Sequence, residues 1–245
     1  MIWLIGSRGM LGMDVEELIL QNGLEYISSD MDVDITQYRE LEGFAGDKPI
    51  SWIINCSAYT AVDRAEDEPH NAFQVNAQGV ENIACLASKR NSRIIHISTD
   101  YVFDGHKQGA YTEQDRANPQ GVYGRTKLEG ERRLKNAAYS HFIIRTAWLY
   151  GRHGPNFVYT MLRLFKQKQA LKVVSDQYGS PTFTRDLAEV LVEIVKQDSR
   201  CYGTYHFTNR GRTTWYDFAK RIYCRARESG IIDREVEINP VSTAE

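Results

Sequence analysis

The sequence predicts an α/β fold in which a doubly wound parallel sheet is joined to a smaller C-terminal lobe. Three observations predict it. Short apolar segments alternate with amphipathic helical segments through residues 1–150, the pattern of a parallel sheet with helices on both faces. A glycine-rich turn follows the first apolar segment, and hydroxyl residues follow a later one. The alternation becomes less regular beyond about Tyr150, so we assign residues 151–245 mainly to the second lobe, interleaved with the first.

The elements of the first part follow from apolar spacing. The segments expected to form strands are residues 2–5, 26–27, 52–56, 93–98 and 141–145. Most are unbroken apolar runs, which is typical of strands buried on both faces. The segments expected to form helices are residues 14–21, 69–89 and 123–135. In the second part we expect a strand at 171–174, a helix at 187–195, a strand at 204–207 and a helix at 213–228.

Composition excludes several classes of protein. The chain has 245 residues, of which 42% are hydrophobic and 25% charged, as in ordinary globular domains. A net charge of -2 gives no basis for a nucleic-acid partner. The four cysteines are far apart, which argues against a disulfide framework or a zinc site and fits the reducing cytoplasm. No stretch approaches the ~18 apolar residues of a membrane helix, so we expect a cytoplasmic protein without a membrane partner.

The turn after the first predicted strand has the pattern G-x-x-G-x-x-G, with Gly6, Gly9 and Gly12 at its glycine positions. Between a strand and a helix, such a turn brings backbone N–H groups and the positive end of the helix dipole against a pyrophosphate. We therefore predict a Rossmann-type dinucleotide site at this turn, with Arg8 beside it. The alternative is a glycine-rich connection that binds no ligand.

The identity of the dinucleotide depends on the end of the second strand. Asp30 can hold the adenosine ribose, as an acid does in sites for NADH. Alternatively, Ser29 and its neighbours leave room for the 2′-phosphate of NADPH, with Arg8 nearby. Asp34, beside Ile35, is placed to accept a bond from adenine, although a charge at a helix N-terminus explains it equally well. NADPH or NADH is therefore the predicted cofactor.

Three residues form a predicted catalytic group. Tyr123 and Lys127 are four positions apart on a predicted helix and share a face. A nearby ammonium favours the ionised phenol, so we expect Lys127 to lower the pKa of Tyr123 toward neutrality. Tyr123 can then give a proton to a carbonyl oxygen that receives hydride at carbon, while Thr99 donates a hydrogen bond to the same oxygen. The alternative is an ordinary solvated pair on a helix. His96, within an apolar strand, is expected to be a core histidine.

With these motifs in this order, the chain resembles the dTDP-4-dehydrorhamnose reductases, a family of extended short-chain dehydrogenases/reductases. The resemblance includes STDYVFDG at 98–105, YGRTKLEGE at 123–131 and DQYGSPT at 176–182. The other matching segments are residues 6–12, 55–66, 75–77, 145–151, 156–157 and 213–218. Because these segments follow one another along nearly the whole chain, their combination is more specific than any single motif.

The resemblance implies reduction of the C4 ketone of dTDP-4-dehydro-L-rhamnose by NAD(P)H, a step of nucleotide-sugar biosynthesis for cell-surface polysaccharide. It gives Thr99 the role of polarising the carbonyl, Tyr123 that of proton donor, and Lys127 that of tuning Tyr123 and holding the nicotinamide ribose. The cofactor contacts that it implies are Met10, Leu11, Ser57, Ala58 and Tyr59, and the substrate contacts are Val62, Asp63, Tyr101 and Trp148. Trp148 would stack on thymine or serve as packing, and Gln177 and Arg185 would meet the pyrophosphate or lie in an ordinary loop.

Two departures from the family pattern bear on this prediction. Members usually run several tens of residues longer, so we expect a chain truncated at its C-terminus or a divergent relative. Some members dimerise around magnesium that carboxylates hold. Asp14 occupies one of these carboxylate positions, but this sequence lacks the partner carboxylate near the C-terminus of the family. We therefore predict no metal site and regard a homodimer as possible. The competing functions are a catalytically idle NADP-binding regulatory subunit of the same fold, and a reductase or epimerase for another nucleotide sugar.

Overall fold

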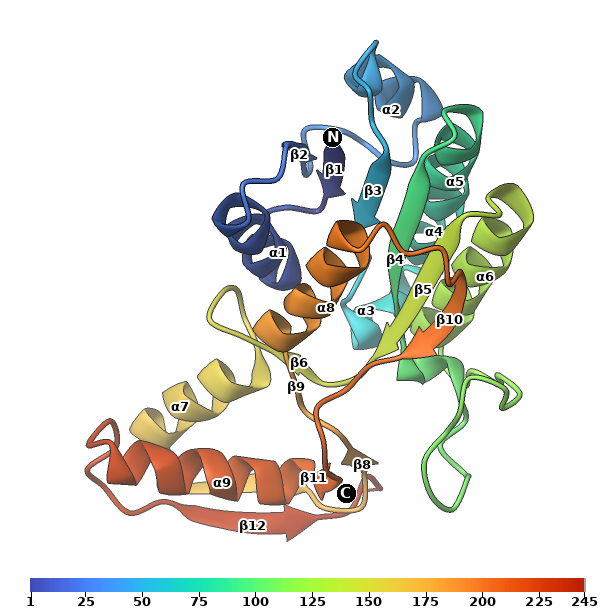
Figure 1. Cartoon of the computed structure of the whole chain (residues 1–245). Coiled ribbons are helices and arrows are strands. Elements are labelled where there is room, and N and C mark those ends of the chain that lie inside the picture. The colour runs from blue at the N-terminus through green and yellow to red at the C-terminus, as the bar shows by residue number, and fades with distance from the viewer. Residues whose placement is uncertain (245) are drawn as a thin grey trace.

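The computed structural model describes residues 1–244, and its centre is a six-stranded sheet in the order β10-β5-β4-β3-β1-β2 (Figure 1). The strands are β1 (Ile2–Ile5), β2 (Tyr26–Ser29), β3 (Trp52–Asn55), β4 (Arg93–Thr99), β5 (His141–Thr146) and β10 (Gly203–His206). Every neighbouring pair is parallel. The predicted doubly wound parallel sheet is therefore confirmed.

Helices cover both faces of this sheet. The helices of this body are α1 (Met10–Gln21), α2 (Tyr38–Ala45), α3 (Val62–Asp67), α4 (Pro69–Phe73), α5 (Val80–Lys89), α6 (Val122–Ala137) and α8 (Thr184–Lys196). On one face, Ile19 of α1 and Leu191 of α8 are buried together with residues of the strands. On the other face, Ile83 of α5 and Leu134 of α6 are buried in a second cluster. These two apolar layers fix the sheet, and therefore the position of its carboxyl edge.

The smaller lobe is built from α7 (Phe157–Gln167), α9 (Trp215–Glu228) and the parallel pair of β7 (Ala170–Val174) and β12 (Glu237–Val241) (Figure 1). Phe165 of α7 and Ala219 of α9 are fully buried in a cluster of its own. Two short pairs, β6 (Leu149–Tyr150) with β9 (Thr182–Phe183) and β8 (Tyr178–Gly179) with β11 (Thr213–Thr214), connect the lobe to the larger body. Although α8 and β10 follow residue 150, they belong to the larger body, so the two parts are interleaved in sequence.

The predicted helix over 69–89 is helical throughout, but its middle differs from an α-helix. Residues Gln74–Gly79 form a π-helical segment between α4 and α5. A π segment carries an extra residue per turn and is frequent at functional sites. It pushes the Asn76 carbonyl oxygen against α6, where a Cβ atom on Gly130 would lie 2.0 Å from it. The sequence gives no sign of this irregularity.

The helices of residues 1–244 are all too short or too polar to cross a membrane.

Candidate active site

The site lies at the carboxyl ends of β1, β3 and β4. Strand order reverses between β1 and β3, and parallel α/β sheets bind ligands at such a reversal. The loops that follow the two strands touch there, since a Cβ atom on Gly6 would lie 2.7 Å from the backbone nitrogen of Ser57. Gly6 also has a φ of 78°, a conformation that glycine adopts without strain. The sequence motif at Gly6 is thus required by the backbone itself.

The glycine turn presents a bare helix N-terminus. Helix α1 begins at Met10, and within residues 1–244 it has neither a side-chain N-cap nor an acidic residue in its first turn. Its first N–H groups and dipole end are therefore available to an anion. Gly12 packs so closely that a Cβ atom would lie 2.0 Å from the Gly6 carbonyl oxygen. This donor set and close approach fit a dinucleotide pyrophosphate.

In the region predicted to bind the adenosine of the cofactor, Asp30 and Asp34 accept hydrogen bonds from backbone N–H groups. Asp30 accepts hydrogen bonds from the backbone N–H groups of Arg8 and Met31, both at 2.9 Å, and so ties the glycine turn to the loop after β2. Asp34 accepts one from the backbone of Thr36 at 2.9 Å. The side chains of Ser29 and Ile35 lie in the interior: the Ser29 hydroxyl accepts from the Trp3 indole at 2.9 Å, and Ile35 is 7% exposed.

Two buried asparagines hold the loop after β3, which contains Ser57, Ala58 and Tyr59. Asn55 accepts hydrogen bonds from the backbone N–H of Ser57 at 3.0 Å and from its hydroxyl at 2.6 Å. Asn76, on the π-helical segment, accepts from the backbone of Tyr59 at 2.9 Å and donates to its carbonyl at 3.1 Å. Sequence reasoning assigned no function to either asparagine, although a polar residue that ends an apolar strand, as Asn55 does, is a usable signal.

The structure brings Thr99 and Tyr123 together. Thr99 ends β4, and its hydroxyl accepts from the backbone N–H of Tyr101 at 3.2 Å. The same hydroxyl donates to the Asp100 carboxylate at 3.1 Å, and it lies close enough to the phenol of Tyr123, in the first turn of α6, to influence the pKa of that phenol. The rings of Tyr101 and Tyr123 meet edge to face with centroids 5.5 Å apart. The Thr99 hydroxyl and the Tyr123 phenol thus lie close together at the carboxyl edge of the sheet.

The pKa of Tyr123 differs from the prediction. Removal of the phenol from water raises its pKa to about 12, and the neighbouring Thr99 hydroxyl only partly offsets this effect. The expectation that Lys127 lowers this pKa toward neutrality was therefore wrong. The reason lies in the position of Lys127, whose Nζ donates to the Ile97 carbonyl at 2.7 Å, within β4. Burial in turn lowers the pKa of Lys127 to about 8.

Lys127 is 2% exposed, which excludes the solvated helix pair. His96, as expected, is a core histidine: it is fully buried, and its ring nitrogens lie 3.1 Å from Asn55 Nδ2 and 3.5 Å from Lys127 Nζ. Its closeness to Lys127 was not expected from the sequence. Nearby, Glu131 and Arg145 form a buried ion pair at 2.7 Å that joins α6 to β5.

The predicted substrate contacts are spread over several elements. Val62 and Asp63 begin α3, and Tyr101, 43% exposed, follows Thr99. Trp148 adopts a positive φ of 48° and stacks on Trp215 of α9, with ring centroids 3.5 Å apart. Trp148 is therefore fixed between the sheet and the smaller lobe, a position compatible with either packing or base stacking.

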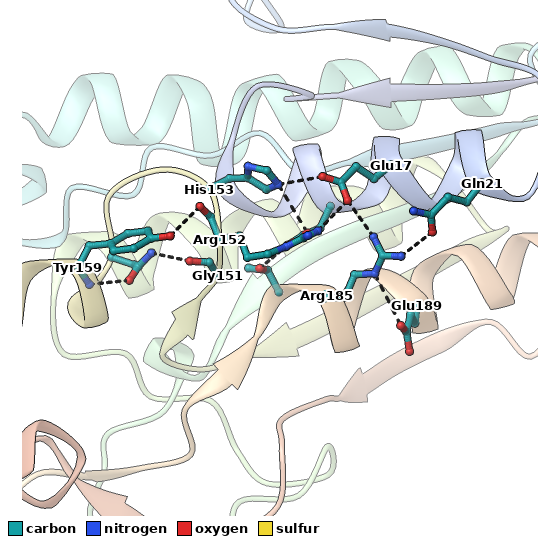
Figure 2. A network of polar contacts seen from close by, with 11 residues as sticks. Glu17, Gln21, Gly151, Arg152, His153, Tyr159, Arg185 and Glu189 are labelled. Atoms are coloured by element: carbon teal, nitrogen blue, oxygen red, sulfur yellow. Dashed lines mark hydrogen bonds and ion pairs between the residues drawn. The ribbon is translucent and has the colours of Figure 1, made fainter. Parts of the chain in front are cut away.

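The structure does not bring Gln177 and Arg185 into contact. Gln177 donates to Thr243 at 3.2 Å. Arg185 contacts Glu17 at 3.1 Å and Gln21 at 2.6 Å, on the exposed side of α1 (Figure 2). The guanidinium of Arg185 thus has protein partners that join α8 to α1.

The same network contains Asp14. Its carboxylate is fully buried and accepts from Thr184 at 2.5 Å and from Arg152 at 3.2 Å. Asp14, Glu17 and His153 offer ligand atoms within 4.8 Å of one another. The guanidinium of Arg152, however, also lies 2.7 Å from Glu17 and lowers the pKa of that carboxyl (Figure 2). A protein cation therefore already balances these carboxylates.

The fold and the site together define an extended short-chain dehydrogenase/reductase. The family model described as RmlD substrate binding domain matches residues 1–245. The chain is 41% identical over 98% of its length to the dTDP-4-dehydrorhamnose reductase of Aggregatibacter actinomycetemcomitans, and covers 84% of that protein. It is 36% identical over 99% of its length to the enzyme of the same name from Salmonella typhimurium, again covering 84%. The chain therefore belongs to the dTDP-4-dehydrorhamnose reductase family.

Solved structures agree with this assignment. The dTDP-4-dehydrorhamnose reductase of Clostridium acetobutylicum superposes with a TM-score of 0.92 at 42% identity, over 99% of this chain and 84% of that one. The one from Bacillus anthracis, solved in complex with NADP, superposes with a TM-score of 0.93 at 36% identity, with the same coverage of both chains.

Proposed function

We propose that this chain reduces the C4 ketone of dTDP-4-dehydro-L-rhamnose to dTDP-L-rhamnose with NADPH or NADH. The observation that carries the proposal is the convergence of the Thr99 hydroxyl and the Tyr123 phenol, one helical turn before the buried Lys127. Such a trio has the groups that a carbonyl oxygen needs when the carbon receives hydride: one hydrogen-bond donor, one proton donor and one reservoir of protons.

The cofactor would lie across the reversal in strand order. The uncapped N–H groups of α1 at Met10 and Leu11 would hold its pyrophosphate, with Arg8 near the 2′-phosphate of NADPH. The loop of Ser57, Ala58 and Tyr59, fixed by the two buried asparagines, would border its central part. When bound, the reduced nicotinamide supplies the hydride.

The protein side of the reaction is proton transfer. Because the pKa of Tyr123 is raised to about 12, the phenol keeps its proton at neutral pH and is loaded for donation. As the ketone oxygen gains charge, Thr99 would donate a hydrogen bond to it and Tyr123 would transfer its proton, which gives the alcohol. Lys127, with a pKa of about 8, can take up or release a proton near neutral pH. Because its Nζ donates to Ile97 and not to Tyr123, a water molecule would carry the proton from Lys127 back to Tyr123.

The substrate would be bound between the two parts of the chain, with residues 1–150 supplying the cofactor site and residues 151–245 mainly the sugar-nucleotide site. Trp148 and Tyr101 offer aromatic surface for the thymine base and the sugar, and Val62 and Asp63 would border the sugar. Gln177 lies in the turn that we assign to the pyrophosphate side. We also propose a homodimer and a cytoplasmic location; the four free cysteines suit a reducing compartment.

The test is a turnover assay with purified protein. Oxidation of NADPH, and then of NADH, is followed with dTDP-4-dehydro-L-rhamnose as substrate, and the sugar product is identified. Parallel titration with each cofactor reports binding alone. Cofactor binding without turnover would contradict the proposal and leave the idle regulatory subunit, whereas turnover only with another nucleotide-sugar ketone would replace the substrate.

A further inference from the structure

Three buried polar side chains from three elements form a connected series beneath the proposed site. Asn55 ends β3, His96 lies in β4 and Lys127 belongs to α6. Their exposed fractions are 0%, 0% and 2%. Asn55 Nδ2 lies 3.1 Å from His96 Nδ1, and His96 Nε2 lies 3.5 Å from Lys127 Nζ. The protein thus connects its buried lysine to a histidine for which the reaction described above has no use.

The orientation of Asn55 determines which nitrogen of His96 carries a proton. The backbone N–H of Ser57 can only donate, so the Asn55 atom at 3.0 Å from it must be the carbonyl oxygen Oδ1. The other end of the amide, Nδ2, then faces His96 Nδ1. Because an amide nitrogen is only a donor, Nδ1 must be the acceptor and carries no proton. Burial and the nearby Lys127 hold the pKa of His96 well below its usual value, so the ring is neutral and its single proton is on Nε2.

The protonated Nε2 points at Lys127 Nζ. An N–H group cannot accept from an ammonium, but it can donate to the lone pair of a neutral amine. We propose that His96 is a positioning residue that donates from Nε2 to Nζ of Lys127 and thereby favours the amine over the ammonium form. At 3.5 Å this hydrogen bond is long, so its contribution is modest. The remaining partner of Nζ, the Ile97 carbonyl at 2.7 Å, accepts from either form and fixes the position of the nitrogen.

The other groups that face Lys127 act in the opposite sense or not at all. Glu131 favours the ammonium by its charge, but its carboxylate accepts from Arg145 at 2.8 and 2.7 Å and from Ser98 at 2.6 Å, so that charge is largely balanced. Burial raises the pKa of the Cys56 thiol to about 12, so this neighbour is neutral. His96 is thus the neighbour that favours the amine by a direct contact.

The tautomer can be measured without any assay of activity. In protein labelled with ¹⁵N-histidine, long-range proton–nitrogen spectra distinguish a ring protonated on Nε2 from one protonated on Nδ1. The His96 signal is assigned by its loss in His96→Gln, with His141→Gln as the matched control. We expect an Nε2–H tautomer, and a chemical-shift change as Lys127 titrates that is lost in Lys127→Met. An Nδ1–H tautomer, or a doubly protonated ring near neutral pH, would overturn the proposal.

The effect of His96 on the pKa of Lys127 is measured by the pH dependence of kcat/KM. This measurement rests on the proposed function. If turnover needs the ammonium of Lys127, activity falls as pH rises through its pKa. Replacement of His96 by Leu removes the donor, so this alkaline limb should move upward by roughly 0.5–1 pH unit, the loss of one net hydrogen bond. His96→Gln can again present an N–H group and should return the limb toward that of the natural protein.

A second variant changes the tautomer with little change of shape. In Asn55→Asp, the carboxylate accepts from a protonated Nδ1, so Nε2 becomes an acceptor for the ammonium and the alkaline limb should also move upward. A fall in kcat/KM at every pH with an unmoved limb would give His96 a merely structural role and overturn the proposal. Absence of turnover in the natural protein, with the Nε2–H tautomer observed, would contradict the proposed function and leave the hydrogen bond standing.

Discussion

Replacement of Tyr123 by Phe removes a single oxygen atom from the proposed proton donor. The ring remains, and with it the edge-to-face contact to Tyr101 at 5.5 Å between centroids. The cost in stability is at most that of one hydrogen bond of the phenol, about 0.5–1.5 kcal/mol net. Since a protein of this size is stable by about 5–15 kcal/mol, the variant should fold and bind the cofactor.

The expected loss of turnover is much larger than this structural cost. The pKa of Tyr123, about 12, keeps nearly every molecule loaded with a proton at pH 7, so the substitution removes a donor that is fully available. Positioned general acid catalysis contributes a factor of about 10²–10⁴, which corresponds to roughly 2.7–5.4 kcal/mol of activation free energy. We therefore expect kcat of Tyr123→Phe to fall by two to four orders of magnitude (about 10²–10⁴-fold) while its Tm changes by only a few degrees.

The assay is cofactor oxidation at saturating NADPH and dTDP-4-dehydro-L-rhamnose, with thermal melting and cofactor titration on the same samples. Tyr205→Phe is the matched control, because its hydroxyl also makes one hydrogen bond, to the Cys201 carbonyl at 2.5 Å, but on β10. The control should keep its turnover. Near-normal turnover of Tyr123→Phe would refute the role of Tyr123, and equal losses in the two variants would point to a general effect of hydroxyl removal.

The remaining predictions concern the cofactor, the substrate and pH. Gly9→Val should weaken NADPH binding strongly, because its methyl groups would obstruct the pyrophosphate. Its Cβ would lie a tight 3.3 Å from the Gly6 carbonyl oxygen, so thermal melting must show that the variant is folded, and an unchanged fluorescence titration of the folded variant would contradict this prediction. Trp148→Ala should raise the substrate KM more than the cofactor KM, since it removes the aromatic surface that we propose for the thymine base; unaltered constants would leave Trp148 with only its packing contact to Trp215. Burial raises the pKa of Asp100 to about 6 from an ordinary 3.8, so between these two pH values the folded protein retains a proton that the unfolded chain loses. The free energy of unfolding should therefore fall as the pH rises from about 4 to about 6. Denaturant titrations over this range should show a smaller fall for Asp100→Asn, and an equal fall in both proteins would contradict the prediction.

The parts of the fold that the sequence predicts well are those with a simple periodicity. The apolar runs that became β1, β3, β4 and β5 are buried on both faces, so burial alone identifies them. Helix α7 was missed, although Phe157, Met161 and Phe165 repeat at a spacing of four, a helical period that could have identified it. The short helices α2 and α3 have too few turns to show a period.

The sequence predicted which residues form the candidate site better than it predicted their pKa values. Their spacing places Tyr123 and Lys127 on one face of a helix. The hydrogen bond from the lysine nitrogen to the Ile97 carbonyl joins α6 to β4, and the spacing of residues cannot predict such a contact between distant elements. Burial, which raises the pKa of Tyr123, depends on packing between distant elements and leaves no local trace. For the same reason Ser29 could not be recognised as a partner of the Trp3 indole.

The π-helical segment Gln74–Gly79 has a consequence for how relatives of this chain can differ in length. Deleting one residue there would restore an ordinary α-helix, so the helix itself would tolerate the loss. The carbonyl oxygen of Asn76 would then withdraw from α6, and Gly130, where a Cβ atom now meets that oxygen at 2.0 Å, would be free to carry a side chain. Length at one position and residue size at another, on two different helices, should therefore vary together: homologues that are one residue shorter in this segment should have lost the glycine as well.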